Sequence, residues 1–278
     1  MIWKKRWIKN TIYCTLFVLL FAQSSLYPIA KSVVVMSVYS KMHERDSFLH
    51  EEKIDIQMKG GAATFQKDYF PFVITFDPSA SFSRYIGAPV DLTILYNFGA
   101  FDMLYGASTL YDKNSSYYST FYGAYAVRYK DSQDIYGLTQ EGEPDIEAIT
   151  KITDFDLKHL VYNSIGNKTP QLDYRITKQE RTMDIDGREF IVFDAQLDME
   201  GMWHQYEEDY MAYIQYGKPP QNAQGESFES LKGYGRIYLH YDQEERISYF
   251  FYIITPDEQT LASTEKEFIQ TAKITKKH

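Results

Sequence analysis

The chain has 278 residues, of which 44% are hydrophobic, 17% aromatic and 24% charged. This composition supports a large hydrophobic core and excludes an intrinsically disordered chain. Four of the 29 basic residues lie in the first nine positions, so the remainder has 25 basic against 38 acidic groups and a net charge of −13. So acidic a body excludes nucleic acid as a ligand, because binding it requires cations that neutralise phosphates.

The first 39 residues have the order of charge and hydrophobicity that is typical of a signal sequence. Lys4, Lys5, Arg6 and Lys9 precede an apolar run over residues 11–22, as the basic region of an export signal precedes its hydrophobic region. The basic residues predict a cytoplasmic N-terminus and an extracytoplasmic body. We therefore divide the chain into a leader, residues 1–39, and a single extracytoplasmic domain, residues 40–278.

Two fates of the leader remain open. Ala22, Gln23 and Ser24 fit a small-x-small cleavage site, which predicts a secreted protein. Residues 11–30, by contrast, carry no charge over about the length that a bilayer core requires, which predicts a single-pass membrane anchor if the leader is not cleaved. The only cysteine, Cys14, lies in this segment. The body therefore has no disulfide, and a cysteine-free exported domain of this size indicates a bacterial envelope protein.

In the first half of the body, short apolar runs separated by turn residues predict strands. The apolar run over residues 70–76 is typical of a buried strand, and Asp77 and Pro78 mark its end. The predicted elements are a helix over residues 37–52 and strands over 54–58, 70–76, 90–96 and 122–130, with loops over 99–120 and 131–143.

In the second half, Asp186 and Gly187 give the strongest hairpin signal, because this dipeptide adopts the positive φ angles of a tight turn. The strand that follows is apolar on both faces, which indicates a central position in a sheet. Before this hairpin, a helical section begins at Pro144 and breaks at Thr153 and Asp154. The remaining predicted elements are hairpin strands over 172–184 and 188–197, a helix over 203–216, a loop over 218–226 and hairpin strands over 235–241 and 246–255.

The last helix carries the clearest signals of any element. Thr255 and Glu258 fit a capping box with Pro256 at the first helical position. Its apolar stripe, which we expect to pack across the sheet, has one polar exception, Glu265. The apolar members are Leu261, Ala262, Phe268, Ile269 and Ala272.

These elements predict an α+β fold with a mainly antiparallel sheet, helices on one face and the C-terminal helix packed across it, behind an N-terminal signal or anchor helix. The final hairpin, followed by an amphipathic helix, resembles the PsbP/DcrB type of α+β sandwich. The resemblance covers roughly the last third of the chain and implies a fold, with no function attached.

The sequence contains no motif of a catalytic, metal or nucleotide site. None of its histidines pair at the helical spacing of metal ligands, and neither H-E-x-x-H nor G-x-S-x-G occurs. We interpret Asp154 and Asp156 as helix-capping residues, and Asp184 and Asp186 as part of the hairpin turn. Neither pair is followed by the further oxygen ligands of a calcium loop, so we predict no metal and no cofactor.

A group of carboxylates near the predicted helix over residues 203–216 offers the one catalytic hypothesis. Paired with Asp198 or Glu200, these carboxylates would supply the acid and base of a cell-envelope hydrolase. A solvated acidic face is the alternative in a chain this acidic. The secondary candidates are Trp203, His204, Glu207 and Glu208.

The segment over residues 96–129 is the densest in aromatic residues. Those of its tyrosines that do not follow the alternation of a strand lie among Gly, Ser and Asn. Tyrosine combines a stacking face with a hydroxyl group, so tyrosines on a loop suit a carbohydrate or protein ligand, although simple packing is the alternative. The preferred function is therefore a non-catalytic binding or interaction module, and a structural accessory subunit of a membrane complex is a further alternative. The predicted binding residues are Tyr105, Tyr111, Tyr117, Tyr118 and Tyr122.

Overall fold

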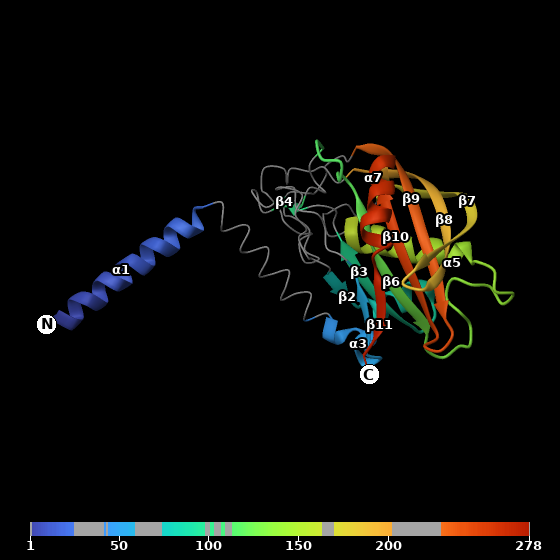
Figure 1. Cartoon of the computed structure of the whole chain (residues 1–278), viewed down its shortest axis with the longest axis horizontal. Helices are drawn as coiled ribbons and strands as arrows, with labels where there is room; N and C mark the ends of the chain where they lie inside the picture. The colour runs from blue at the N-terminus through green and yellow to red at the C-terminus, as the bar shows by residue number, and fades with distance from the viewer. Residues whose placement is uncertain are drawn as a thin grey trace.

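The computed structural model describes residues 2–24, 42, 44–58, 74–97, 101–102, 107–108, 113–162, 170–201 and 229–277. Within these residues, seven strands form one sheet in the order β2-β3-β6-β10-β9-β8-β7, and every neighbouring pair is antiparallel (Figure 1). The predicted α+β class with a mainly antiparallel sheet is confirmed. The strands are β2 Ile74–Phe76, β3 Val90–Asn97, β6 Phe121–Tyr129, β7 Leu172–Ile185, β8 Arg188–Glu200, β9 Ser230–Asp242 and β10 Ile247–Thr255.

Two pairs of short strands accompany this sheet in the described part of the chain. Strand β1, Ile54–Gln57, pairs with β11, Lys273–Lys276, and so joins the two ends of the body. Strand β4, Phe101–Asp102, pairs with β5, Ala107–Ser108. The strand at β1 was predicted from its alternation, but β11 was not, because a four-residue strand at a chain end has too few residues to show a period.

Helices cover both faces of the sheet, as Figure 1 shows for α5 on one side and α7 on the other. The first face packs against α4 Ser79–Ile86, α5 Ile146–Asp154 and the π-helix η2 Phe155–Tyr162. The second packs against α3 Phe48–Glu51, α7 Glu258–Thr264 and the π-helix η3 Glu265–Ile269. The C-terminal helix lies across the sheet as predicted, whereas the other helices are divided between the two faces.

Strand β8 shows why the sheet needs cover on both sides. Phe193 is fully buried in the cluster with Ile149 of α5, and Phe190 is fully buried in the cluster with Phe268 of η3. Successive side chains of a strand point to opposite faces, so the apolar alternation predicts two cores. The strand was predicted to be central; it is paired on both sides, by β7 and β9, but lies next to the edge strand β7.

The two hairpins form where the turn residues predict them. Asp186 and Gly187 have φ angles of 55° and 74°, as the tight turn between β7 and β8 requires. The turn between β9 and β10 ends at Arg246, whose φ angle is 57°.

The helix boundaries differ from the predicted ones in three places. Asp145 caps α5 and accepts a hydrogen bond from the Ala148 amide at 3.1 Å, so the helix begins after Pro144 rather than at it. The expected break after α5 is a change to the π-helical geometry of η2, without a gap. Asp257, rather than Thr255, caps α7: it directly precedes the first helical residue, Glu258, and accepts a hydrogen bond from the Thr260 amide at 2.9 Å.

Other differences concern short elements. Helix α4 was not predicted, because its eight residues, SASFSRYI, have little helix propensity. In the described part of the predicted strand over residues 70–76, β2 is an edge strand rather than a buried one. The predicted helix over 203–216 and the loop over 218–226 lie outside the described residues.

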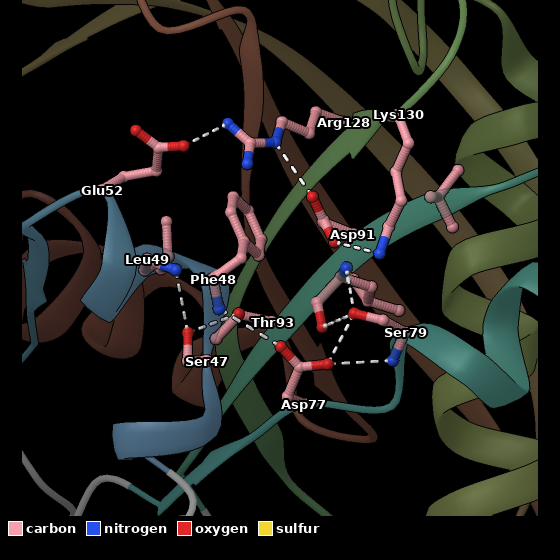
Figure 2. A network of polar contacts seen from close by, with 12 residues as sticks. Ser47, Phe48, Leu49, Glu52, Asp77, Ser79, Asp91, Thr93, Arg128 and Lys130 are labelled. Carbon is pink, nitrogen blue, oxygen red and sulfur yellow. Dashed lines mark hydrogen bonds and ion pairs between the residues drawn. The ribbon is translucent and has the colours of Figure 1, made fainter.

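A network of polar contacts docks α3 on the sheet (Figure 2). Arg128 of β6 donates to Glu52 at 2.8 Å and to Asp91 of β3 at 3.0 Å. Ser47 caps α3 and shares a buried hydrogen bond of 2.6 Å with Thr93. The cap at Ser47 starts a new helix there, so the predicted helix over residues 37–52 is interrupted by a bend at Ser47, between helical residues 44–46 and α3.

Helix α1, Ile2–Ala22, occupies the predicted leader. Its large apolar side chains, including Trp7 and Phe17, are exposed. Among the described residues, no helix combines the length and apolar composition needed to span a bilayer.

Candidate functional site

Residues 113–120 of the aromatic segment form a turn that leads into β6 at one end of the sheet. Tyr118 is 8% exposed and donates its hydroxyl to the carboxylate of Glu229, which also pairs with Lys113 at 2.8 Å. Partial burial opposes ionisation of Glu229, but the hydrogen bonds from Lys113 and Tyr118 outweigh it and lower the pKa of this carboxyl. The turn is thereby tied to the residue that precedes β9.

Two further contacts attach this turn to neighbouring elements. Thr260 of α7 donates to the carbonyl oxygen of Ser116 at 2.8 Å, and Thr120 shares a buried hydrogen bond of 2.8 Å with Thr255 of β10. Tyr117 is half-buried, and Asn114 is exposed. These contacts hold the turn over residues 113–120 in place, and it keeps exposed residues on its surface. We call this turn the ledge.

The structure corrects the prediction for Tyr122. This residue lies in β6, in line with the predicted strand, but it is fully buried and stacks on Phe268 with ring centroids 4.7 Å apart, so it cannot line a binding surface. The strand begins one residue earlier than predicted, and alternation turns the Tyr122 ring into the core below η3. Tyr105 and Tyr111 lie outside the described residues.

A groove of about 300 Å³ lies on the sheet face beside this end. Strand register places its side chains in two rows across β7, β8 and β9. The first row is Asp173, Asp198 and Lys232, and the second is Arg175, Gln196 and Tyr234.

The chemistry of the groove is polar and balanced in charge. Lys232 forms an ion pair with Asp198, while Asp173 and Arg175 are exposed on β7. Tyr234 of β9 is half-buried and contributes an aromatic ring to the groove, which Tyr174 of β7 also lines. Such a surface can donate and accept hydrogen bonds and stack on a ring, and it has no excess of charge to attract an ion.

On the same face of the sheet, further along β7 and β9, lies Glu265, the one polar residue in the apolar stripe of the last helix. Its carboxylate accepts from Arg236 of β9 at 2.7 Å, from Arg181 of β7 at 3.1 Å and from the Tyr238 hydroxyl at 2.6 Å. Burial first, and the nearby carboxylate second, raise the pKa of Tyr238 well above its usual value. The network fixes η3 on the strands that carry the groove.

A second polar cluster lies on the opposite face, beneath η2. Asp156 is fully buried and accepts a hydrogen bond from Tyr125 at 2.6 Å, and Tyr252 stacks on Tyr125 at 4.7 Å. Burial is the largest cause that raises the pKa of both tyrosines. Asp156 is thus a core residue and not a helix cap as predicted. Because all three side chains are buried, a ligand in solution cannot reach the cluster, and its role is to hold η2 on the sheet.

The secondary candidates Trp203, His204, Glu207 and Glu208 lie outside the described residues. Of their proposed partners, Asp198 lies in the groove, and the backbone oxygen of Glu200 accepts from the Tyr162 hydroxyl at 2.5 Å. Among the described residues, no group of three or more His, Cys, Asp or Glu side chains could hold a metal ion.

Sequence reasoning missed five of the six residues in these two rows, namely Asp173, Arg175, Gln196, Lys232 and Tyr234. The available signal was that polar residues occupy alternate positions in predicted strands. It was insufficient because the relative register of β7, β8 and β9 decides which side chains form a row.

Comparison of the chain with known protein families, with curated proteins and with solved structures found no match. The function must therefore be argued from the geometry of this end of the sheet.

Proposed function

We propose that the protein is an extracytoplasmic, non-catalytic binding module whose ligand is an uncharged oligosaccharide. The observation that carries the proposal is the open groove, where Tyr234 and Gln196 lie beside two acidic and two basic side chains. Sugar rings stack on aromatic faces, and their hydroxyl groups both donate and accept hydrogen bonds. A protein ligand is the other class that the same surface suits.

The ledge over residues 113–120 extends the proposed site beyond the groove. Glu229, which binds Tyr118 and Lys113, directly precedes β9, the strand that carries Lys232 and Tyr234 of the groove. Tyr117 supplies a second half-buried ring on this ledge. Its partial exposure supports the proposal that it contacts the ligand, as the sequence predicts for the aromatic segment.

The proposed location is the bacterial cell envelope. The basic residues before the apolar run of α1, and the exposed apolar side chains of that helix, support an export signal or a membrane anchor. We also propose a PsbP/DcrB-like sandwich, on the basis of the β9–β10 hairpin followed by α7. This finer fold assignment carries no function.

The proposed function is tested by titrating the full chain with N-acetylglucosamine tetramer in a calorimeter. Tyr234→Ala should weaken binding about tenfold, since it removes a stacking partner whose loss costs about 1.4 kcal/mol. Tyr234→Phe should bind more tightly than Tyr234→Ala, because it retains the stacking face. Tyr241→Ala, at the other end of β9, is the matched control.

Absence of binding to the tetramer and to a panel of other uncharged oligosaccharides would contradict the proposed ligand class. Equal affinities of the Tyr234→Ala and Tyr241→Ala variants would contradict the proposed site.

One observation favours a hydrolase as the second candidate function. Asp173 lies directly opposite Asp198 across β7 and β8, so two carboxylates share one face of the groove. Retaining glycosidases use carboxyl groups about 5–5.5 Å apart. Release of reducing sugar from the tetramer that is abolished in Asp198→Asn would establish this activity, and no release at any enzyme concentration would remove it.

A further inference from the structure

Strand β7 forms one edge of the large sheet, and no other described strand pairs with its outer side. Such an edge presents unpaired backbone N–H and C=O groups that can add another strand. The pairing of β7 with β8 is regular from Leu172 to Ile176 and is interrupted by irregularities between Ile176 and Arg181. The pairing is regular again from Arg181 to Ile185, but Arg181 in that stretch is already held by Glu265. Because bulges disrupt a ladder, the stretch over residues 172–176 is the regular part of the edge whose charged side chains lie outside that network.

This stretch alternates sharply between its two faces. Leu172 is buried, and Tyr174 and Ile176 pack partly buried against the core beneath α5 and η2. Asp173 and Arg175 are exposed on the opposite face, in the groove. A strand that pairs here must be apolar on one face and must present complementary charges on the other.

The same stretch of a second copy meets both requirements. We propose that two copies of the chain pair antiparallel through β7 about a two-fold axis at Tyr174, joining their sheets. In this register each Asp173 lies opposite the other copy's Arg175, and each Leu172 lies opposite the other copy's Ile176. The two Tyr174 rings meet at the axis, as an aromatic cross-strand pair. An isologous interface of this kind closes at two copies.

Other registers of the two strands fail on charge or on face. An axis at Asp173 places two aspartates opposite each other, and an axis at Arg175 places two arginines opposite each other. A parallel pairing in register places Asp173 beside the other copy's Asp173, and Arg175 beside the other copy's Arg175. A slip by one residue turns the charged face of one copy toward the apolar face of the other. The charges thus select one register, although exposed ion pairs add little affinity of their own.

Asp173 and Arg175 also line the groove, but the proposal does not rest on oligosaccharide binding, because its test measures association of the chain without added sugar. The test is sedimentation velocity of the full chain in detergent over a range of concentrations. The wild-type chain should show a monomer–dimer equilibrium. Asp173→Arg and Arg175→Asp should each raise its dissociation constant at least tenfold, since each places like charges opposite each other twice per dimer.

Mixing the two variants provides the decisive arm of the test. One chain then carries two arginines and the other two aspartates, so a heterodimer regains both ion pairs and should form with close to wild-type affinity. Circular dichroism should show that both variants are folded, since both side chains are exposed.

Three results would overturn the proposal. The first is a wild-type chain that remains monomeric at every concentration. The second is a dimer that either single variant leaves unchanged, as association through α1 would. The third is a mixture that associates no better than its components, as expected if β7 pairs with an unrelated peptide instead.

Discussion

Replacing Glu265 is expected to destabilise the fold more than replacing an exposed carboxylate. One oxygen of Glu265 accepts all three hydrogen bonds, from Arg236, Arg181 and Tyr238. The Glu265 side chain is 12% exposed, and Tyr238 is fully buried. This carboxylate therefore attaches the C-terminal helix to two strands of the sheet.

The magnitude follows from what each partner retains. Breaking a buried ion pair costs about 3–5 kcal/mol, but Arg236 keeps Asp194 at 2.5 Å and Arg181 is 39% exposed, so both losses are partly screened. Glu265→Gln keeps an acceptor for Tyr238 and should lower the free energy of unfolding by about 2 kcal/mol. Glu265→Ala also leaves the Tyr238 hydroxyl without this acceptor and should lower it by about 3–4 kcal/mol.

Urea unfolding with linear extrapolation measures both effects. Glu244→Gln, at an exposed position in the turn between β9 and β10, is the matched control and should stay within about 0.5 kcal/mol of the wild type. The reasoning is refuted if both Glu265 variants are as stable as this control, or if the Gln variant is the less stable of the two.

Three further predictions concern the interior. Gly123→Ala should lower the free energy of unfolding by about 3 kcal/mol or more, because a Cβ atom there overlaps the carbonyl oxygen of Leu95 in the neighbouring strand. Asp145→Ala should cost about 1 kcal/mol through the lost helix cap of α5. Burial raises the pKa of Tyr125 and Tyr252 in the folded state, so their contribution to stability is full below about pH 10 and falls as the pH rises above it. Thermal unfolding checks the two substitutions, and tyrosinate absorbance recorded against pH checks the tyrosines.

Each of these three has a clear contrary result. An unchanged melting temperature for Gly123→Ala would mean that β3 and β6 separate without cost. An Asp145→Ala variant as stable as the wild type would show that the cap contributes no stability to the fold. Tyrosinate absorbance that reaches its full value before the protein unfolds would show that the buried tyrosines are accessible.

Local signals in the sequence predicted the central architecture because they act over short distances. Asp186 and Gly187 specify a turn by their own backbone preferences, and the alternation of β8 specifies a strand that is buried on both faces. The polar exception at Glu265 was visible in the sequence, but its meaning was not. Its partners Arg181 and Arg236 come from strands that are distant along the chain, and only the sheet order brings them together.

The candidate site shows the same limit more strongly. Tyr117 and Tyr118 were predicted as neighbours of small polar residues, and they do lie on a turn. Tyr122 was assigned wrongly, because β6 is buried on both faces over residues 121–127, so a tyrosine at its start lies in the core whichever way it points. The groove depends on the register of three strands, which no local pattern encodes.

The most direct test of the proposed binding site is hydrogen–deuterium exchange of the full chain with and without a saturating uncharged oligosaccharide. Ligand in the groove should slow exchange of the amides of β8 near Gln196 and of β9 near Tyr234, and leave those of β2 at the opposite edge unchanged. Protection that spares these two segments while appearing elsewhere on the molecule would contradict the account.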